Sequence, residues 1–127
     1  MRRLKIESTP ETLDDILKKF LAAIPEVKAA SIVSVEGLPI ASALPQDVDE
    51  TRIAAMTAAL LSLAERAVIE MNKGDFVQLF VRGTSGYLLV LAAGLNAVLT
   101  VSTTEDVRLG LIFLDAKRVC EKIAKLI

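Results

Sequence analysis

The sequence predicts an α/β (α+β) protein in which helices cover both faces of a five-stranded antiparallel sheet, giving a three-layer sandwich. Three segments carry apolar residues at the spacing of amphipathic helices, and five shorter segments are rich in β-branched or other apolar residues. Short glycine-containing turns separate the last three strands, which is typical of an antiparallel meander. The expected order is α-β-β-α-β-β-β-α, within a single domain that spans residues 1–127.

The first helix is predicted to start near residues 8–11 and to end at Pro25. Ser8 followed by Glu11 fits a capping box, and Thr9 as the cap with Pro10 at the first helical position is the alternative start. The apolar residues that follow define one buried face: Leu13, Ile16, Leu17, Phe20, Leu21 and Ile24. Pro25 ends the helix because the residue before a proline is disfavoured in the helical conformation.

The next segment predicts a β-hairpin. Residues 29–35 are rich in β-branched side chains and form its first strand, and residues 38–43 form the returning strand. Glu36 and Gly37 make the turn, since glycine accepts the positive φ that hairpin turns require. Pro39 has no backbone N–H to donate, so the returning strand is expected at an edge of the sheet.

A long helix over residues 48–71 is predicted at the centre of the chain. Asp47 and Glu50 form the expected cap pair, and Gly74 is expected to take the left-handed conformation after the helix ends. The apolar residues of this helix occupy two adjacent faces. The first face comprises Ile53, Met56, Leu60, Leu63, Ala64, Ala67 and Met71, and the second comprises Ala54, Ala58, Leu61, Val68 and Ile69. One face can pack on the sheet of the same domain, and the other is expected to pack on a second copy of the chain.

Three further strands and a last helix complete the predicted fold. The strands cover residues 76–82, 87–92 and 97–102, and the last helix is preceded by the expected cap Thr-Thr-Glu-Asp at residues 103–106. The buried side of this helix is expected to contain Leu109, Ile112, Ala116, Val119, Ile123 and Ile127, with Phe113, Cys120 and Leu126 beside them.

Composition limits the possible functions. Apolar residues make up 53% of the chain, the formal net charge is −1, and the sequence has one cysteine and no histidine. Without histidine a serine–histidine triad is excluded, and with a single cysteine so is a zinc site of the usual Cys/His type within one chain. The balanced charge gives no electrostatic footprint for nucleic acid.

The chain is expected to be cytoplasmic and not to insert into a membrane. Its first residues are charged and lack the apolar core of a signal peptide, and no apolar run reaches the roughly 18 residues of a membrane span. Cys120 has no second cysteine to pair with, so a reducing compartment is the default.

Several motifs that could suggest chemistry have a better structural interpretation. The Gly-Thr-Ser-Gly segment at residues 83–86 lacks the Gly-Lys-Ser/Thr ending of a phosphate loop and precedes no helix, so it is predicted to be a hairpin turn. The carboxylates at residues 14–15 and 47–50 are explained by a solvated helix side and by capping rather than by a metal ion. Cys120 lies on an apolar helix without a neighbouring base, which favours a small core residue.

Five segments, each common by itself, form a recognisable series when taken in this order. They are residues 35–42 (VEGLPIAS), 47–56 (DVDETRIAAM), 60–67 (LLSLAERA), 86–89 (GYLL) and 107–111 (VRLGL). Together they resemble the Roadblock family, which includes dynein light chains and MglB-like regulators of small GTPases. The resemblance extends over nearly the whole chain. It implies a Roadblock/profilin-like fold and a protein that is no enzyme and needs no cofactor, because the family has no shared catalytic motif.

The resemblance also implies a homodimer, in which the central helices pack across a two-fold axis and the following strands pair into a ten-stranded sheet. We therefore assign the interface to the second face of the central helix and to the strand after it. The residues are Ala54, Ala58, Leu61, Val68, Ile69, Phe76, Val77, Leu79 and Val81.

A small Ras-like GTPase is the partner that the resemblance implies. The residues assigned to this contact are Arg52, Ser62, Arg66 and Glu70, and Arg52, Arg66 and Arg82 are candidates for an arginine finger, although a rim contact or a solvated ion pair is the commoner role. The alternatives are an adaptor of motor complexes, or a small-ligand sensor, for which the Val-, Leu- and Ala-rich strands offer few polar groups. The basic residues Arg2, Arg3 and Lys5 could contact anionic lipid or RNA, or belong to a frayed terminus.

Overall fold

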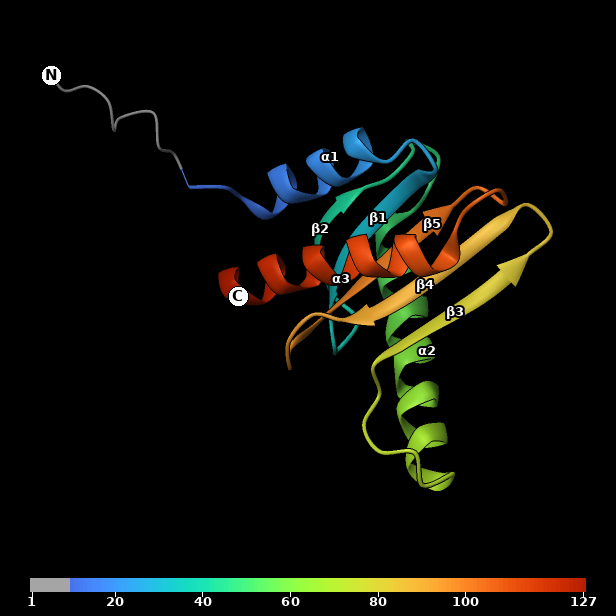
Figure 1. Cartoon of the computed structure of the whole chain (residues 1–127). Coiled ribbons are helices and arrows are strands. Elements are labelled where there is room, and N and C mark those ends of the chain that lie inside the picture. Colours follow the sequence, from blue (N-terminus) through green and yellow to red (C-terminus); the bar gives the residue numbers. More distant parts are fainter. Residues whose placement is uncertain (1–9) are drawn as a thin grey trace, which may run out of the picture.

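The computed structural model describes residues 10–127 and contains the eight predicted elements in the predicted order (Figure 1). They are α1 (Leu13–Ala23), β1 (Val27–Ser34), β2 (Pro39–Ala43), α2 (Glu50–Glu70), β3 (Gln78–Gly83), β4 (Gly86–Ala92), β5 (Ala97–Thr103) and α3 (Leu109–Leu126). The bounds of the strands differ from the predicted ones by one or two residues. The predicted caps at Ser8 and Thr9, and the basic residues Arg2, Arg3 and Lys5, lie outside the described residues.

The five strands form one antiparallel sheet in the order β2-β1-β5-β4-β3. The meander predicted for the last three strands is confirmed, because β4 pairs with both β3 and β5. The edge position predicted for the strand with Pro39 is also confirmed. Pro39 is the first residue of β2 and lies opposite Val33, after a register shift that accommodates it.

The helices cover the two faces of the sheet as predicted, with α1 and α3 on one face and α2 on the other (Figure 1). The main core lies between the sheet and the pair α1 and α3. Its fully buried side chains are large and aliphatic, and they include Leu17 of α1, Ile32 of β1, Leu89 of β4, Leu99 of β5 and Ile123 of α3. Burying such side chains is the main source of stability of this layer.

The contact between α2 and the sheet is smaller and more polar. Its buried apolar cluster consists of Leu61, Val90 and Val98. Beside it, the hydroxyl oxygens of Thr57 on α2 and Thr100 on β5 share a buried hydrogen bond of 2.8 Å. This bond satisfies two hydroxyls that would otherwise be buried without a partner, and it fixes the position of α2 along the sheet.

The first two helices begin later than predicted, with α1 capped three residues after Thr9 and α2 capped two residues after Asp47. Thr12 caps α1, since its Oγ1 accepts from the N–H of Asp15 while the Asp15 carboxylate accepts from the N–H of Thr12, which completes a capping box. Glu11 lies before the helix and accepts a hydrogen bond of 2.8 Å from Lys19. Asp49, rather than Asp47, caps α2, because its carboxylate accepts from the N–H groups of residues 51 and 52.

The cap predicted for α3 at residues 103–106 is wrong. Thr103 belongs to β5, and the N–H of Thr104 donates to the carbonyl of Glu26, which continues the pairing of β5 with β1. The sheet therefore uses the residues that would have capped the helix, and α3 starts after Arg108, whose side chain makes no cap hydrogen bond. The buried side of α3 also ends earlier than predicted, at Ile123, because Leu126 and Ile127 are 47% and 52% exposed.

Two tight turns depend on residues with positive φ. Residues 83–86 form the predicted β3–β4 hairpin turn, with Gly83 paired to Gly86. A Cβ atom on Gly86, at φ +151°, would lie 2.0 Å from the carbonyl oxygen of Thr103, so only glycine fits. After α2, Gly74 takes the predicted positive φ, at +88°, and Asn72, directly after the last helical turn, is left-handed as well, at φ 57°.

Candidate interaction surface

The two apolar faces of α2 have roles opposite to the predicted ones. Most of the second face lies on the sheet of its own protomer, where Ala54 is 0% and Leu61 5% exposed, and Ala58 and Val68 are half-buried. Ile69, the remaining residue of that face, is 64% exposed. Ala54 and Leu61 therefore cannot add area to a contact with another chain, and their assignment to such an interface is corrected. The pattern of apolar residues did not decide which face packs on the sheet, because it left out the polar residue Thr57, which is buried on the same side as Ala54 and Leu61.

The first face of α2 is the free one. Met56 is 51%, Leu63 65% and Met71 69% exposed, and Ala67 between them is exposed as well. We refer to Met56, Leu63, Ala67 and Met71 as the open face of α2. The C-terminal half of the helix, which carries most of this face, projects beyond the ends of the strands (Figure 1). Apolar side chains grouped on a protruding helix are typical of an interaction site.

The edge strand β3 presents further apolar residues. Val81 in β3 is 44% exposed and Val77, directly before the strand, is 69% exposed. Leu79 of β3 and Phe76 of the preceding connection pack against the cluster around Leu61. Within residues 10–127, β3 pairs with β4 alone, so one side of its backbone has no partner strand. An apolar edge strand of this kind is suited to pairing with another strand.

The opposite side of β3 carries an aromatic cluster. The ring of Phe80, which is 48% exposed, meets those of Tyr87 and Phe113 edge to face at centroid distances of 6.0 and 6.3 Å. This arrangement supports the edge strand against α3.

Two grooves border α2. The first, which we call the α2–β4 groove, has a volume of about 240 Å³ and opens beside the open face, where Ile53, Met56 and Leu60 face Leu88 of β4. The second lies at the opposite flank of the helix and has a volume of about 340 Å³. We call it the hairpin groove, because it lies between α2, the α2–β3 connection and the tips of the β1–β2 and β4–β5 hairpins. It is lined by Val35, Leu61, Glu65, Ile69, Asp75, Phe76, Ala92, Gly94, Leu95, Ala97 and Val98.

The residues predicted to contact a partner, Arg52, Ser62, Arg66 and Glu70, are all exposed on α2. Ser62, Arg66 and Glu70 follow each other at intervals of four and share one stripe of the helix. This polar stripe lies between the open face and the flank that borders the hairpin groove.

The comparison with protein families decides the identity of the fold. The family model of the Roadblock/LC7 domain matches residues 13–103, which cover every element except α3. The chain belongs to the Roadblock/LC7 family. An uncharacterized relative, MJ1340 of Methanocaldococcus jannaschii, is 39% identical over 97 residues, which are 76% of this chain and 84% of that protein.

Solved structures share the Roadblock/LC7 fold. A Roadblock/LC7 domain from Streptomyces avermitilis superposes with a TM-score of 0.83 at 21% identity, covering 89% of this chain and 95% of that one. MglB of Myxococcus xanthus also gives 0.83, at 23% identity and with 90% and 93% covered. Profilin II of Acanthamoeba castellanii gives a TM-score of 0.64 at 12% identity, with 91% of this chain and 98% of that one covered. The feature shared with profilin is therefore the fold.

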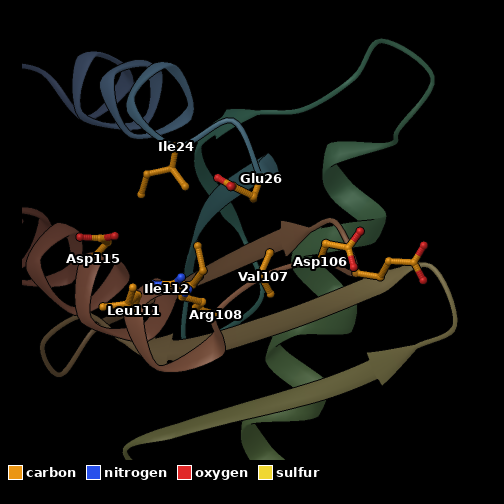
Figure 2. A pocket seen from close by; sticks show the side chains of 9 residues that line it. Ile24, Glu26, Asp106, Val107, Arg108, Leu111, Ile112 and Asp115 are labelled. Atoms are coloured by element: carbon orange, nitrogen blue, oxygen red, sulfur yellow. The ribbon is translucent and has the colours of Figure 1, made fainter.

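A further hollow of this Roadblock/LC7 domain lies on the other side of the sheet, between the end of α1 and the start of α3 (Figure 2). It has a volume of about 710 Å³. Glu26, Glu105, Asp106 and Asp115 line it together with Arg108, above the apolar side chains of Ile24, Val107, Leu111 and Ile112. Glu105 and Asp106 just before α3 suit the positive end of its dipole, which accounts for part of this acidic surface.

The thiol and the carboxylates whose pKa values are shifted have structural roles. Burial raises the pKa of the Cys120 thiol to about 12, so this thiol stays protonated and unreactive at neutral pH. Hydrogen bonds from Thr12 lower the pKa of Asp15, and the hydrogen bond from Lys19 lowers the pKa of Glu11. Among residues 10–127, no three side chains of the His, Cys, Asp or Glu types are placed to hold one metal ion, and no helix is long and apolar enough to span a bilayer.

Proposed function

We propose that this Roadblock/LC7 protein is a non-enzymatic, dimeric scaffold that binds and regulates a small Ras-like GTPase. The observation that carries the proposal is the open face of α2, which continues into the edge strand β3. Membership of the Roadblock/LC7 family and the fold shared with MglB support the GTPase as the class of partner.

The two copies meet, in this proposal, through the open face and β3. Met56, Leu63 and Met71 are the α2 contacts, in place of Ala54 and Leu61, and Val77 and Val81 keep their predicted role. A two-fold axis perpendicular to the sheet at the β3 edge would pair the two β3 strands antiparallel, join the two sheets edge to edge and place both α2 helices on the same side. This arrangement would cover the apolar residues that a lone protomer leaves in water.

The partner contact is proposed for the remaining exposed surface of α2. Ser62 and Arg66 stay in solvent when the open face is covered, because they lie on a different part of the helix surface. Arg52 and Glu70 lie nearly in line with Leu63, so they would stand at the rim of the dimer contact. Regulation by binding needs no catalytic group on this chain, and an arginine among them would act on the partner's nucleotide only if it reached the partner's site.

The experiment that tests the proposal has two steps. Light scattering on the purified chain at micromolar concentration measures the oligomeric state, and a dimer is expected. Each small Ras-like GTPase of the source genome is then purified and titrated against the chain, once with GDP and once with a non-hydrolysable GTP analogue. We expect one of them to bind with a preference for one nucleotide state. A monomeric chain contradicts the dimer, and a chain that binds none of these GTPases contradicts the regulatory role.

A small-ligand sensor is the second candidate, and the α2–β4 groove is the observation in its favour. The groove is mostly apolar, with the hydroxyls of Thr57, Thr100 and Ser102 and the ammonium group of Lys28 at its border. At about 240 Å³ it is smaller than most ligand pockets, which hold roughly 300–1,000 Å³. In the dimeric scaffold the second copy would close this groove, so a thermal-shift screen that finds a small ligand only in the monomeric chain would favour the sensor.

A further inference from the structure

We propose that the hairpin groove is the docking site of the GTPase and that it takes an apolar side chain of the partner next to a lysine or arginine. This inference rests on the proposed function and names the surface and the chemistry of its contact. It assigns the GTPase to the flank of α2 that faces away from the open face.

The groove combines side chains from three segments that are far apart in the sequence. Leu95, at the tip of the β4–β5 hairpin, is 93% exposed, and Ile69 on α2 is 64% exposed. Val35, at the end of the β1–β2 hairpin, completes the apolar wall, and its N–H donates to the carbonyl of Asn96 over 3.2 Å. This hydrogen bond joins the two hairpin tips, so the wall is held in place before a partner arrives.

The exposure of Leu95 has no explanation within the protomer. A turn between two strands is usually made of polar residues and glycine, and Gly94 and Asn96 fit that rule. Leu38 at the tip of the neighbouring hairpin is also 65% exposed. Two apolar side chains at adjacent tips, beside a groove, form the kind of anchor that interfaces bury.

The charge of the groove indicates what its occupant carries. Glu65 on α2 and Asp75 in the α2–β3 connection line it, and no lysine or arginine does so among the described residues. A carboxylate pair beside an apolar wall attracts a cationic side chain and repels an acidic one. A partner segment with an apolar residue near a lysine or arginine therefore fits the groove in shape and charge.

The position of the groove leaves the proposed dimer intact. Leu61 and Glu65 of the groove are on one flank of α2, whereas Met56 and Leu63 of the open face are on the other. The second copy and the GTPase would thus contact opposite flanks of the same helix. The polar stripe of Ser62, Arg66 and Glu70 lies between them and would extend the partner contact.

The test compares two double variants in the GTPase titration described above. Leu95→Ala with Glu65→Lys changes the groove at two exposed positions. We expect this double variant to raise the dissociation constant of the GTPase complex by roughly tenfold or more. The matched control, Leu114→Ala with Glu121→Lys, makes the same changes on exposed positions of α3 and is expected to bind like the wild type. The loss caused by Glu65→Lys alone should shrink as salt is added, because salt screens charges near the surface.

Each outcome decides between the two proposals. If the wild type binds a GTPase and the groove variant binds it equally well, the groove is not the docking site, while the proposed function stands. If the wild type binds no GTPase in either nucleotide state, both proposals fail. If the groove variant instead changes the mass of the particle in light scattering, the groove holds another copy of this chain, which also overturns the inference.

Discussion

A negative charge on the open face of α2 should separate the proposed dimer. Leu63 is 65% exposed in the protomer, so Leu63→Asp removes only a minor part of the side chain's packing within one chain. Burying a leucine fully contributes about 1.5–3 kcal/mol, and the exposed part of Leu63 would therefore contribute about 1–2 kcal/mol at the interface. Two-fold symmetry doubles this to about 2–4 kcal/mol, and the buried carboxylates add their own desolvation cost. The dimer dissociation constant should rise by roughly 30-fold or more, since about 1.4 kcal/mol corresponds to a factor of ten.

Sedimentation equilibrium over a dilution series measures this change directly. The wild type should approach twice the chain mass of 13.7 kDa at concentrations where the variant stays at the single mass. Leu114→Asp, on the outer side of α3 and 46% exposed, is the matched control and should dimerise like the wild type. A Leu63→Asp chain that dimerises with the wild-type constant would refute the reasoning, because the open face would then be no interface. Urea unfolding of the dissociated protomer should show a loss of only about 0.5–1 kcal/mol, which corresponds to the part of Leu63 that is buried within one chain.

Three further predictions concern the protomer itself. Thr57→Val leaves the hydroxyl of Thr100 buried without its partner and should lower the unfolding free energy by about 1–3 kcal/mol in urea, whereas the double variant with Thr100→Val should lose less than the sum of the single changes. Gly86→Ala places a Cβ on a backbone oxygen and should cost more than about 2 kcal/mol, while Gly74→Ala, with open space around it, should cost about 1–2 kcal/mol; equal losses by denaturation would contradict this. The pKa of Asp15 is lowered in the folded chain, so the contribution of its cap is complete above the ordinary aspartate pKa of 3.8 and is lost as pH falls through the lowered value; Asp15→Asn should flatten the acid limb of a stability–pH curve.

The sequence was sufficient to predict the order of elements, the edge strand and the three layers, because each depends on local spacing. The spacing of Ile16, Leu17 and Phe20 allows only one buried face for α1, and these residues are buried. Pro39 alone is enough to exclude a central position for its strand, because proline has no N–H to donate to a neighbouring strand. Helix starts were harder to predict, since Thr103 and Thr104 offered a good cap but were taken by strand pairing, a contact with residues far away in the sequence.

The candidate interaction surface could not be predicted from the spacing of apolar residues alone. Both faces of α2 are apolar, and which of them packs on the sheet is decided by small residues such as Ala54 and by the buried Thr57–Thr100 pair. The hairpin groove was missed because its walls include residues 35, 65, 69 and 95, which only the fold brings together. One signal was present in the sequence, namely the leucine in the Gly-Leu-Asn turn, where a polar residue is the rule.

The unequal layers of this domain explain why α2 is the element available for binding. Large aliphatic side chains join α1 and α3 to the sheet, so that side of the molecule holds most of the buried core. Below α2 the sheet presents Ser31, Thr100 and small apolar residues, and the helix is positioned by Leu61 and one hydroxyl pair. This small contact area with the sheet involves only one side of the helix, which leaves the rest of its circumference exposed. The exposed part carries an apolar flank and a polar stripe beside a groove with two carboxylates, so one helix has the chemically different surfaces that the proposed dimer and the proposed partner contact each require.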